Sequence, residues 1–133
     1  MAGLRIESPL SAEQEELIHR VIGAAIEVHR RLGPGFLEGI YQRALGHEFK
    51  LQGIAYECEK EILVPYKDIH IPGQRLDLLV ESQLILELKV VDHLAPIHEA
   101  QLMSYLKATG LKVGLLVNFK TRILKDGIKR IVH

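Results

Sequence analysis

The chain has 133 residues, 47% of them hydrophobic, and its 17 basic residues balance 17 acidic ones. This length predicts one domain, residues 1–133, that buries about two thirds of the surface its unfolded form exposes. The neutral net charge excludes a uniformly basic nucleic-acid-binding protein, so any contact with nucleic acid must be local. The positive mean hydropathy favours a homo-oligomer in which another copy covers part of the apolar surface.

Cys58 is the only cysteine, which excludes an intramolecular disulfide and a metal site built from cysteines. The first ten residues lack the apolar stretch of a signal peptide. The longest apolar runs are too short to span a bilayer. We therefore expect a soluble cytoplasmic protein without a membrane partner.

Two helices are predicted in the first third of the chain. Ser11 followed by Gln14 indicates a capping box, and apolar residues continue at helical spacing until Gly33 stops the pattern. A second helix is predicted from Leu37 to Gln52, with Gly53 just beyond its end. The chain therefore opens with two helices separated by a short turn.

Strands are predicted to follow. Alternation from Ile54 to Tyr66 indicates a strand exposed on one side, while Pro65 and Pro72-Gly73 indicate a sheet edge or a turn. Two more apolar strands are predicted, from Gln74 to Val80 and from Leu84 to Val91. The remaining predicted elements are a helix from Pro96 to Gly110, a strand from Leu111 to Phe119, a turn at Lys125-Asp126-Gly127 and a possible strand from Ile128 to Val132. This order predicts an α/β fold with a mixed sheet.

Charges interrupt the two most apolar strands. Asp77 lies in the first, and Glu87 and Lys89 lie two apart in the second, so the latter pair shares one face. The short Glu81-Ser82 link indicates a hairpin, which lets Asp77 and Glu87 converge. Burying such a charge alone costs several kcal/mol, in order-of-magnitude terms, so the placement needs a reason.

Two acids and a lysine are the ingredients of a hydrolytic site for a hard metal ion. Carboxylate oxygens suit Mg²⁺ or Mn²⁺, which polarise a phosphoryl oxygen and lower the pKa of a bound water. Lys89 could position that water or neutralise developing charge. The alternative is a structural ion pair between Glu87 and Lys89. A plain ion pair, however, has no need of the third charge at Asp77.

Asp77 followed by Glu87-Leu88-Lys89 resembles the D...ExK signature of the PD-(D/E)XK nuclease superfamily, although Leu76 stands where the formal motif has proline. The segment Gly35 to Tyr41 resembles the GxxExxY pattern of a small prokaryotic family within that superfamily, as does the preceding segment Val28 to Gly35. Gln101 and Tyr105 are similar to the QxxxY element of related nucleases. The resemblance spans roughly residues 15 to 120.

The resemblance implies a restriction-endonuclease-like fold with an αβββαβ core, an extra N-terminal helix and a possible C-terminal strand. It implies Mg²⁺ or Mn²⁺ as cofactor, held by Asp77, Glu87 and the Leu88 carbonyl, with Lys89 as a catalytic group. It assigns the glutamate of GxxExxY to Glu38, as a remote acid that reaches the metal site or orients its water. The residues alone leave Glu38 open as a first-turn glutamate favoured by the helix dipole.

Three polar residues on the predicted helices, Tyr41, Gln101 and Tyr105, could serve the site or be purely structural. Tyr41 could bond a ligand, but a tyrosine on a helix's inner face is more often a core residue with a satisfied hydroxyl. Gln101 and Tyr105 are four apart on the predicted third helix, so they share a face. They could position the site carboxylates or touch a nucleic-acid backbone, and the resemblance places both in the catalytic set.

A basic patch is predicted near the C-terminus, opposed only by Asp126. A solvated charged edge explains this patch as well as phosphate contact does. Its members are Lys120, Arg122, Lys125, Lys129 and Arg130. We name Lys120, Arg122 and Lys125 as the candidate contacts to nucleic acid.

The leading hypothesis is a metal-dependent nuclease that cleaves phosphodiester bonds, with nucleic acid as partner and DNA favoured over RNA. One alternative is a self-assembling structural protein that keeps the fold. The other is a nucleic-acid-binding accessory subunit whose site serves recognition. Metal-dependent cleavage distinguishes the first from both others.

Overall fold

The computed structural model describes residues 8–133. The prediction that the N-terminus is not a signal peptide falls largely on residues 1–7, which lie outside the described range. Among the residues described, no helix is long and apolar enough to cross a membrane. The elements, in order, are α1 (Ala12–Leu32), α2 (Glu38–Gln52), β1 (Tyr56–Tyr66), β2 (Ile69–Val80), β3 (Leu84–Lys89), α3 (Pro96–Thr109), β4 (Val113–Asn118), the 3₁₀ helix η1 (Leu124–Gly127) and β5 (Ile128–Val132).

The helix boundaries follow the local signals in the sequence. The Ser11 hydroxyl accepts from the Gln14 amide at 3.1 Å, and the Gln14 side chain accepts from the Ser11 amide at 2.9 Å, which completes the predicted capping box. Gly53 and Gly110 end α2 and α3 with left-handed backbones, at φ of 70° and 76°. Pro96 is the first residue of α3, where its missing N–H costs no helical hydrogen bond.

The sheet has five strands in the order β1-β2-β3-β4-β5. Only β3 and β4 are parallel, and α3 is their crossover; the other neighbours are antiparallel. The predicted α/β fold is confirmed, because α2, β1, β2, β3, α3 and β4 make the αβββαβ core, to which α1 and β5 are added.

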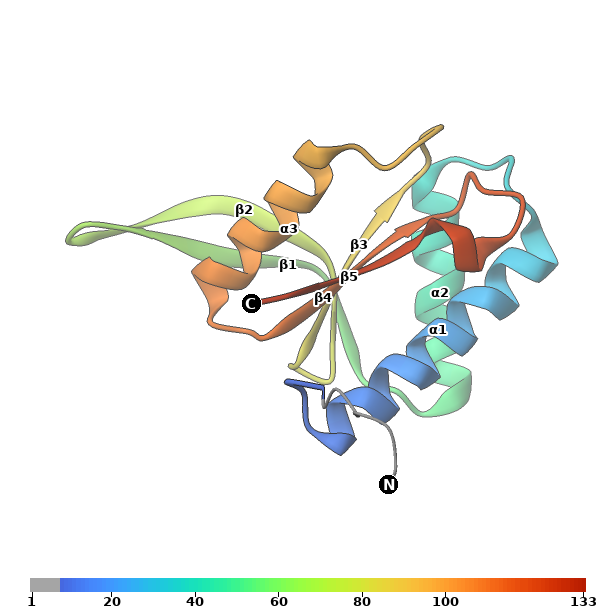
Figure 1. The fold of residues 1–133 in the computed structure, drawn as a ribbon, viewed down its shortest axis with the longest axis horizontal. Coiled ribbons are helices and arrows are strands. Elements are labelled where there is room, and N and C mark those ends of the chain that lie inside the picture. Colours follow the sequence, from blue (N-terminus) through green and yellow to red (C-terminus); the bar gives the residue numbers. More distant parts are fainter. Residues whose placement is uncertain (1–7) are drawn as a thin grey trace, which may run out of the picture.

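Helices cover both faces of the sheet, with α1 and α2 on one side and α3 on the other (Figure 1). Leu86 and Leu88 of β3 belong to the core cluster that includes residues of α1 and α2. Ile85, which precedes Leu86 and points to the opposite face, packs with Leu102 and Leu106 of α3. Because β3 is covered on both faces, a charged side chain on this strand is at least partly buried.

The hairpin of β1 and β2 differs from its prediction. It turns at Lys67 rather than at Pro72-Gly73, and β2 begins at Ile69 rather than Gln74. Pro72 and Gly73 instead lie opposite a shift of register in β1, where a missing N–H and a positive φ are tolerated. The one-sided burial predicted for the first strand is wrong, because β1 is exposed on both faces apart from Ile62 and the half-buried Tyr56. The turn end of this hairpin, residues 62–74, projects away from α1 and α2 and is here called the β1–β2 arm (Figure 1).

Candidate active site

Asp77 and Glu87 are joined across β2 and β3 where the ladder between these strands ends. The last paired residues are Leu78 and Leu86. Beyond them, the Asp77 amide donates to Glu87 Oε1 at 3.2 Å, and the Leu88 amide donates to Asp77 Oδ2 at 2.8 Å. Side-chain carboxylates therefore replace backbone carbonyls as acceptors at this point of the sheet.

The two carboxyl groups are held away from water and close to one another. Glu87 is only 6% exposed and Asp77 is half-buried. Burial, followed by the neighbouring charge of Asp77, raises the pKa of Glu87 to about 8. Burial also raises the pKa of Asp77, against the opposing effects of the Leu88 amide and the Lys89 charge. Without a cation, the site therefore disfavours ionisation of both carboxyl groups at once.

Lys89 is half-buried at the end of β3, on the same face as Glu87. Its positive charge lowers the pKa values of Asp77, Glu87 and Glu38, in opposition to their burial. Among the ion pairs of residues 8–133, however, none involves Lys89. A plain Glu87–Lys89 ion pair is thus not what the described residues form, and the ammonium group is available to a ligand.

The direction of the Leu88 carbonyl follows from the hydrogen bonds beside it. The Lys89 carbonyl accepts from the Phe119 amide at 2.9 Å, on the β4 side of β3. Successive carbonyls of a strand point to opposite edges, so the Leu88 carbonyl points toward β2. The β2–β3 ladder has ended there, and Asp77 is the neighbouring residue.

Two helices bring further polar groups toward Asp77 and Glu87. Glu38 is the first residue of α2 and is half-buried; burial, and then the charge of Asp77, raises its pKa. Tyr105 of α3 is also half-buried, and burial followed by the charges of Glu87 and Asp77 raises the pKa of its hydroxyl. The Tyr105 hydroxyl accepts from Gln74 Nε2 at 3.1 Å. Both residues therefore lie within the electrostatic field of the site.

Two other predicted residues have different surroundings. Gln101 is exposed, and no hydrogen bond of its side chain to Asp77, Glu87 or Lys89 occurs within residues 8–133. Tyr41 is fully buried and stacks on Phe119 with ring centroids 4.4 Å apart. Its hydroxyl donates to the Gly33 carbonyl and accepts from the Phe36 amide. Tyr41 is therefore a core residue that fixes the turn before α2, and so positions Glu38.

Glu59 is a neighbour of the site that the sequence did not reveal. Its charge contributes to the raised pKa values of Asp77 and Glu38. Its backbone is left-handed, with φ of 52°, and its carboxylate accepts from Gln42 Nε2 of α2 at 3.1 Å. The pairs on either side of Glu59 place it opposite Asp77, a register that simple alternation along β1 could not supply.

The predicted C-terminal basic patch is largely neutralised by acids. Lys120 lies 2.6 Å from Asp92, Lys129 lies 2.9 Å from Glu99, and Arg130 lies 2.8 Å from Glu15. Arg122 and Lys125 are exposed, and neither is in an ion pair with another described residue.

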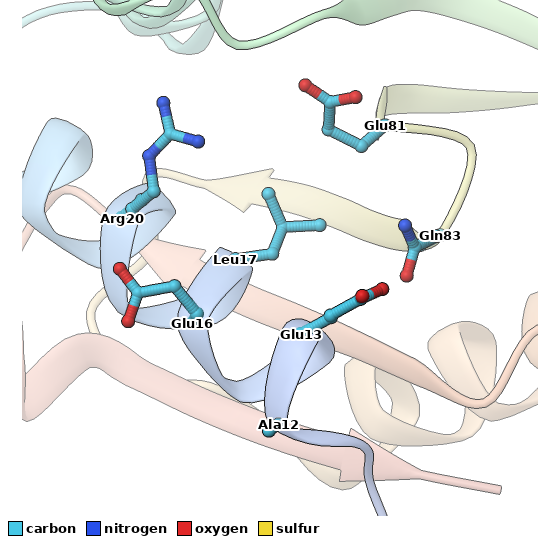
Figure 2. A pocket seen from close by; sticks show the side chains of 7 residues that line it. All are labelled: Ala12, Glu13, Glu16, Leu17, Arg20, Glu81 and Gln83. Carbon is cyan, nitrogen blue, oxygen red and sulfur yellow. The ribbon is translucent and has the colours of Figure 1, made fainter.

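A sizeable surface cavity lies elsewhere on the molecule. It has a volume of about 520 Å³ and lies between the first turns of α1 and the β2–β3 turn (Figure 2). One of its acids, Glu81, already accepts a hydrogen bond from the Ala55 amide at 2.9 Å. None of Asp77, Glu87 and Lys89 lines this cavity, so cavity size does not locate the chemistry.

The donor atoms at the site suit Mg²⁺ or Mn²⁺. No group of three or more His, Cys, Asp or Glu side chains within residues 8–133 is arranged to hold a metal ion. Mg²⁺, however, is usually bound through one or two carboxylates, with water and substrate phosphate completing its shell. Asp77, Glu87 and the Leu88 carbonyl supply such oxygen donors, and a bound cation would compensate the second negative charge that burial disfavours.

Comparison with known proteins agrees with this geometry. The family model described as the PD-(D/E)XK nuclease superfamily matches residues 15–131, which include every residue of the site. Neither the curated proteins nor the solved structures contain a match. Because the family model covers most of the chain and its carboxylates and lysine meet at the end of β3, the protein belongs to the PD-(D/E)XK nuclease superfamily.

Proposed function

We propose that this protein is a metal-dependent nuclease that hydrolyses phosphodiester bonds of nucleic acid. The observation that carries the proposal is the pairing of two buried carboxyl groups, Asp77 and Glu87, beside a lysine that has no ion-pair partner among residues 8–133. Such strongly perturbed acids at a strand end are typical of functional sites.

Asp77, Glu87 and the Leu88 carbonyl are the proposed ligands of Mg²⁺ or Mn²⁺. When bound, the cation supplies Lewis-acid polarisation of a phosphoryl oxygen and lowers the pKa of a bound water. The residues of the chain would bind the cation and orient the attacking water. The β2–β3 hairpin holds both carboxylates, and the covered faces of β3 limit access of bulk water.

Lys89 is proposed to stabilise charge that develops on the phosphate, or to position the attacking water. Glu38 is proposed to orient that water from the start of α2. In the reaction the water oxygen adds to phosphorus and one P–O ester bond breaks. The attacking water gives up one proton and the leaving oxygen takes one, so the products are a phosphomonoester and a hydroxyl end.

The proposal extends to the narrower family, to the roles of Tyr105 and Gln101, and to the contacts with substrate. The spacing of Glu38 and Tyr41 supports membership of the GxxExxY family within the superfamily. Tyr105 is proposed to position the site carboxylates, and the exposed Gln101 to contact the nucleic-acid backbone. DNA is the proposed substrate, and Arg122 and Lys125, with Lys120, are proposed phosphate contacts.

A cleavage assay tests the proposal. Wild-type protein is incubated with single-stranded and duplex DNA and with RNA, in Mg²⁺, in Mn²⁺ and in EDTA. Glu87→Gln, which keeps the side-chain size and removes the charge, is the matched control. We expect metal-dependent cleavage by the wild type alone. Equal cleavage by Glu87→Gln, or no cleavage of any substrate in either metal, would overturn the proposal.

One observation favours a second function, self-assembly. Val64 pairs with Ile71 and Tyr66 pairs with Ile69, so these four side chains share one face of the β1–β2 arm. All four are exposed, by 36% for Val64 and more for the others. Such an apolar face favours association of copies, and an assembled protein that cuts nothing would support this second function over the first.

A further inference from the structure

Three basic side chains of α2 lie along one groove of the surface. Arg43, His47 and Lys50 recur at i, i+4 and i+7, so they form one stripe along the helix. All three are exposed. Together with Tyr56 and Cys58 of β1 they line a groove of about 340 Å³, here called the α2 groove.

The α2 groove carries the positive charges of Arg43 and Lys50, and no acid is among its lining residues. Within residues 8–133, neither Arg43 nor Lys50 is in an ion pair, in contrast to Lys120, Lys129 and Arg130 at the C-terminus. A solvated helix face would also carry basic residues, but such a face usually mixes both signs of charge.

The shape of the α2 groove depends on a close contact between helix and strand. A Cβ atom on Gly46 would lie 2.7 Å from the Tyr56 hydroxyl oxygen, so only glycine lets this ring lie against the helix. Tyr56 also packs on Phe49, with ring centroids 5.7 Å apart. The floor of the groove is therefore an aromatic ring packed against α2, with the basic side chains beside it.

The α2 groove leads to the site at Asp77 and Glu87. Gln42, at the site end of the stripe, lines the groove and donates to the Glu59 carboxylate at 3.1 Å. Glu59 in turn acts electrostatically on Asp77 and on Glu38. One helix thus carries the basic stripe and, at its first residue, an acid of the site.

We propose that the α2 groove binds the phosphodiester backbone of the nucleic acid and leads it to the site. This inference rests on the proposed nuclease function and names the surface that holds its substrate. From Arg43 to Lys50 the helix rises about 10 Å, which matches roughly three phosphates of one strand at 3.4 Å rise each. The ligand is recognised by charge and by an aromatic floor, so binding is independent of base sequence.

Binding without cleavage tests the α2 groove separately from catalysis. Fluorescein-labelled duplex DNA, single-stranded DNA and RNA are titrated with full-length protein in EDTA, by anisotropy, at several salt concentrations. Arg43→Gln/Lys50→Gln is the test variant. Lys107→Gln/Lys112→Gln, two exposed lysines outside the groove, is the matched control, and Arg122→Gln/Lys125→Gln tests the C-terminal patch.

We expect the groove variant to bind more weakly, with its slope of log K against log salt reduced by about 1.4 to 1.8, because each of the two lost phosphate contacts removes about 0.7 to 0.9. The control should bind like the wild type. Unchanged binding of the groove variant, or weakening only in the C-terminal variant, would overturn the inference. If wild-type protein binds none of the probes, the inference fails, while the nuclease proposal is decided by the cleavage assay in Mg²⁺ and Mn²⁺. If binding depends on the groove but no substrate is cut, only the nuclease proposal fails.

Cys58 provides a second readout, because this single cysteine is exposed and lines the α2 groove. Its reaction with a thiol reagent should slow several-fold when duplex or single-stranded DNA saturates the protein. In Cys58→Ser/Lys112→Cys the new thiol lies outside the groove and should react at the same rate with or without DNA. Equal rates for Cys58 in both conditions would contradict binding in the groove.

Discussion

The carboxylate of Glu87 accepts a hydrogen bond from the backbone amide of Asp77, at the position where the β2–β3 ladder gives way to side-chain contacts. A second hydrogen bond runs in the opposite direction between the strands, because the Asp77 carboxylate accepts from the amide of Leu88, the residue after Glu87. The strand ends therefore hold the carboxylates in register without occupying all of their oxygen lone pairs.

The roles of ligand and catalyst can be separated by substitution. Asp77→Asn and Glu87→Gln should abolish Mg²⁺ binding and cleavage, because each removes an anionic oxygen donor. Lys89→Ala should keep metal binding and slow cleavage by about 10² to 10³, the usual scale for one electrostatic contributor. Calorimetric titration with Mn²⁺ beside single-turnover cleavage measures both. A Lys89→Ala variant that no longer binds metal would contradict this division.

The stability of the metal-free protein should depend on pH through Glu87. Its pKa rises from 4.5 to about 8 on folding, so the folded state holds a proton that the unfolded state has released between these values. Stability therefore falls as the pH rises through this window, and each pKa unit of the difference is worth about 1.4 kcal/mol. Urea unfolding in EDTA between pH 5 and 8 measures the effect.

Glu87→Gln is the control for that pH dependence, because other titrating groups are common to both proteins. The variant should gain stability relative to the wild type as the pH rises, and Mg²⁺ should stabilise the wild type alone. Parallel stability curves for the two proteins would show that Glu87 is ionised in the folded state over the whole window.

Tyr41 should prove structural rather than catalytic. Tyr41→Phe leaves the Phe36 amide and the Gly33 carbonyl without a partner, which should cost about 1 to 3 kcal/mol of unfolding free energy. Thermal melts measure the loss, and the exposed Tyr66→Phe should change little. Folded Tyr41→Phe protein should bind metal normally. Loss of metal binding or cleavage with unchanged stability would instead give Tyr41 a role at the site.

Self-association should depend on the apolar face of the β1–β2 arm. We expect a homo-oligomer at micromolar concentration, measured by sedimentation, and a shift toward monomer in Ile69→Lys/Ile71→Lys. Ile123→Lys, at a residue 58% exposed outside the arm, is the matched control. A wild-type monomer, or equal shifts in both variants, would exclude the arm as the interface.

Much of the fold follows from local signals. The capping box at Ser11, the glycines that end the helices and the alternation around Glu87 all act within a few residues, so sequence reasoning reaches them. The hairpin at Glu81 and Ser82 was predicted correctly, and both residues adopt the positive φ that its turn requires. The strand of Glu87 ends at Lys89 instead of Val91, because the Asn118 side chain binds the backbone of Val91.

Features that depend on register were missed. Glu59 lies beside Asp77 because of its left-handed backbone and the pairing of β1 with β2. The alternation of apolar and polar residues along β1 indicates neither feature. The turn at Lys67 was missed because Pro72-Gly73 carries the stronger turn composition, yet the arm absorbs these residues at its register shift. The neutralisation of Lys120 by Asp92 is likewise a tertiary contact between residues far apart in the sequence.

The arm also divides the molecule into parts of unequal local stability. From Ile69 to Asp77, β2 pairs only with β1, and a two-stranded ribbon is marginally stable in water. Amide hydrogens of the arm should therefore exchange early, while those of β3 and β4, in the centre of the sheet, should exchange only on global unfolding. Asp77 lies at this boundary, where its hydrogen bonds with Glu87 and Leu88 join it to β3. We therefore expect that the arm can unfold locally, or be cleaved by a protease at Lys67, without separating the carboxylates of Asp77 and Glu87.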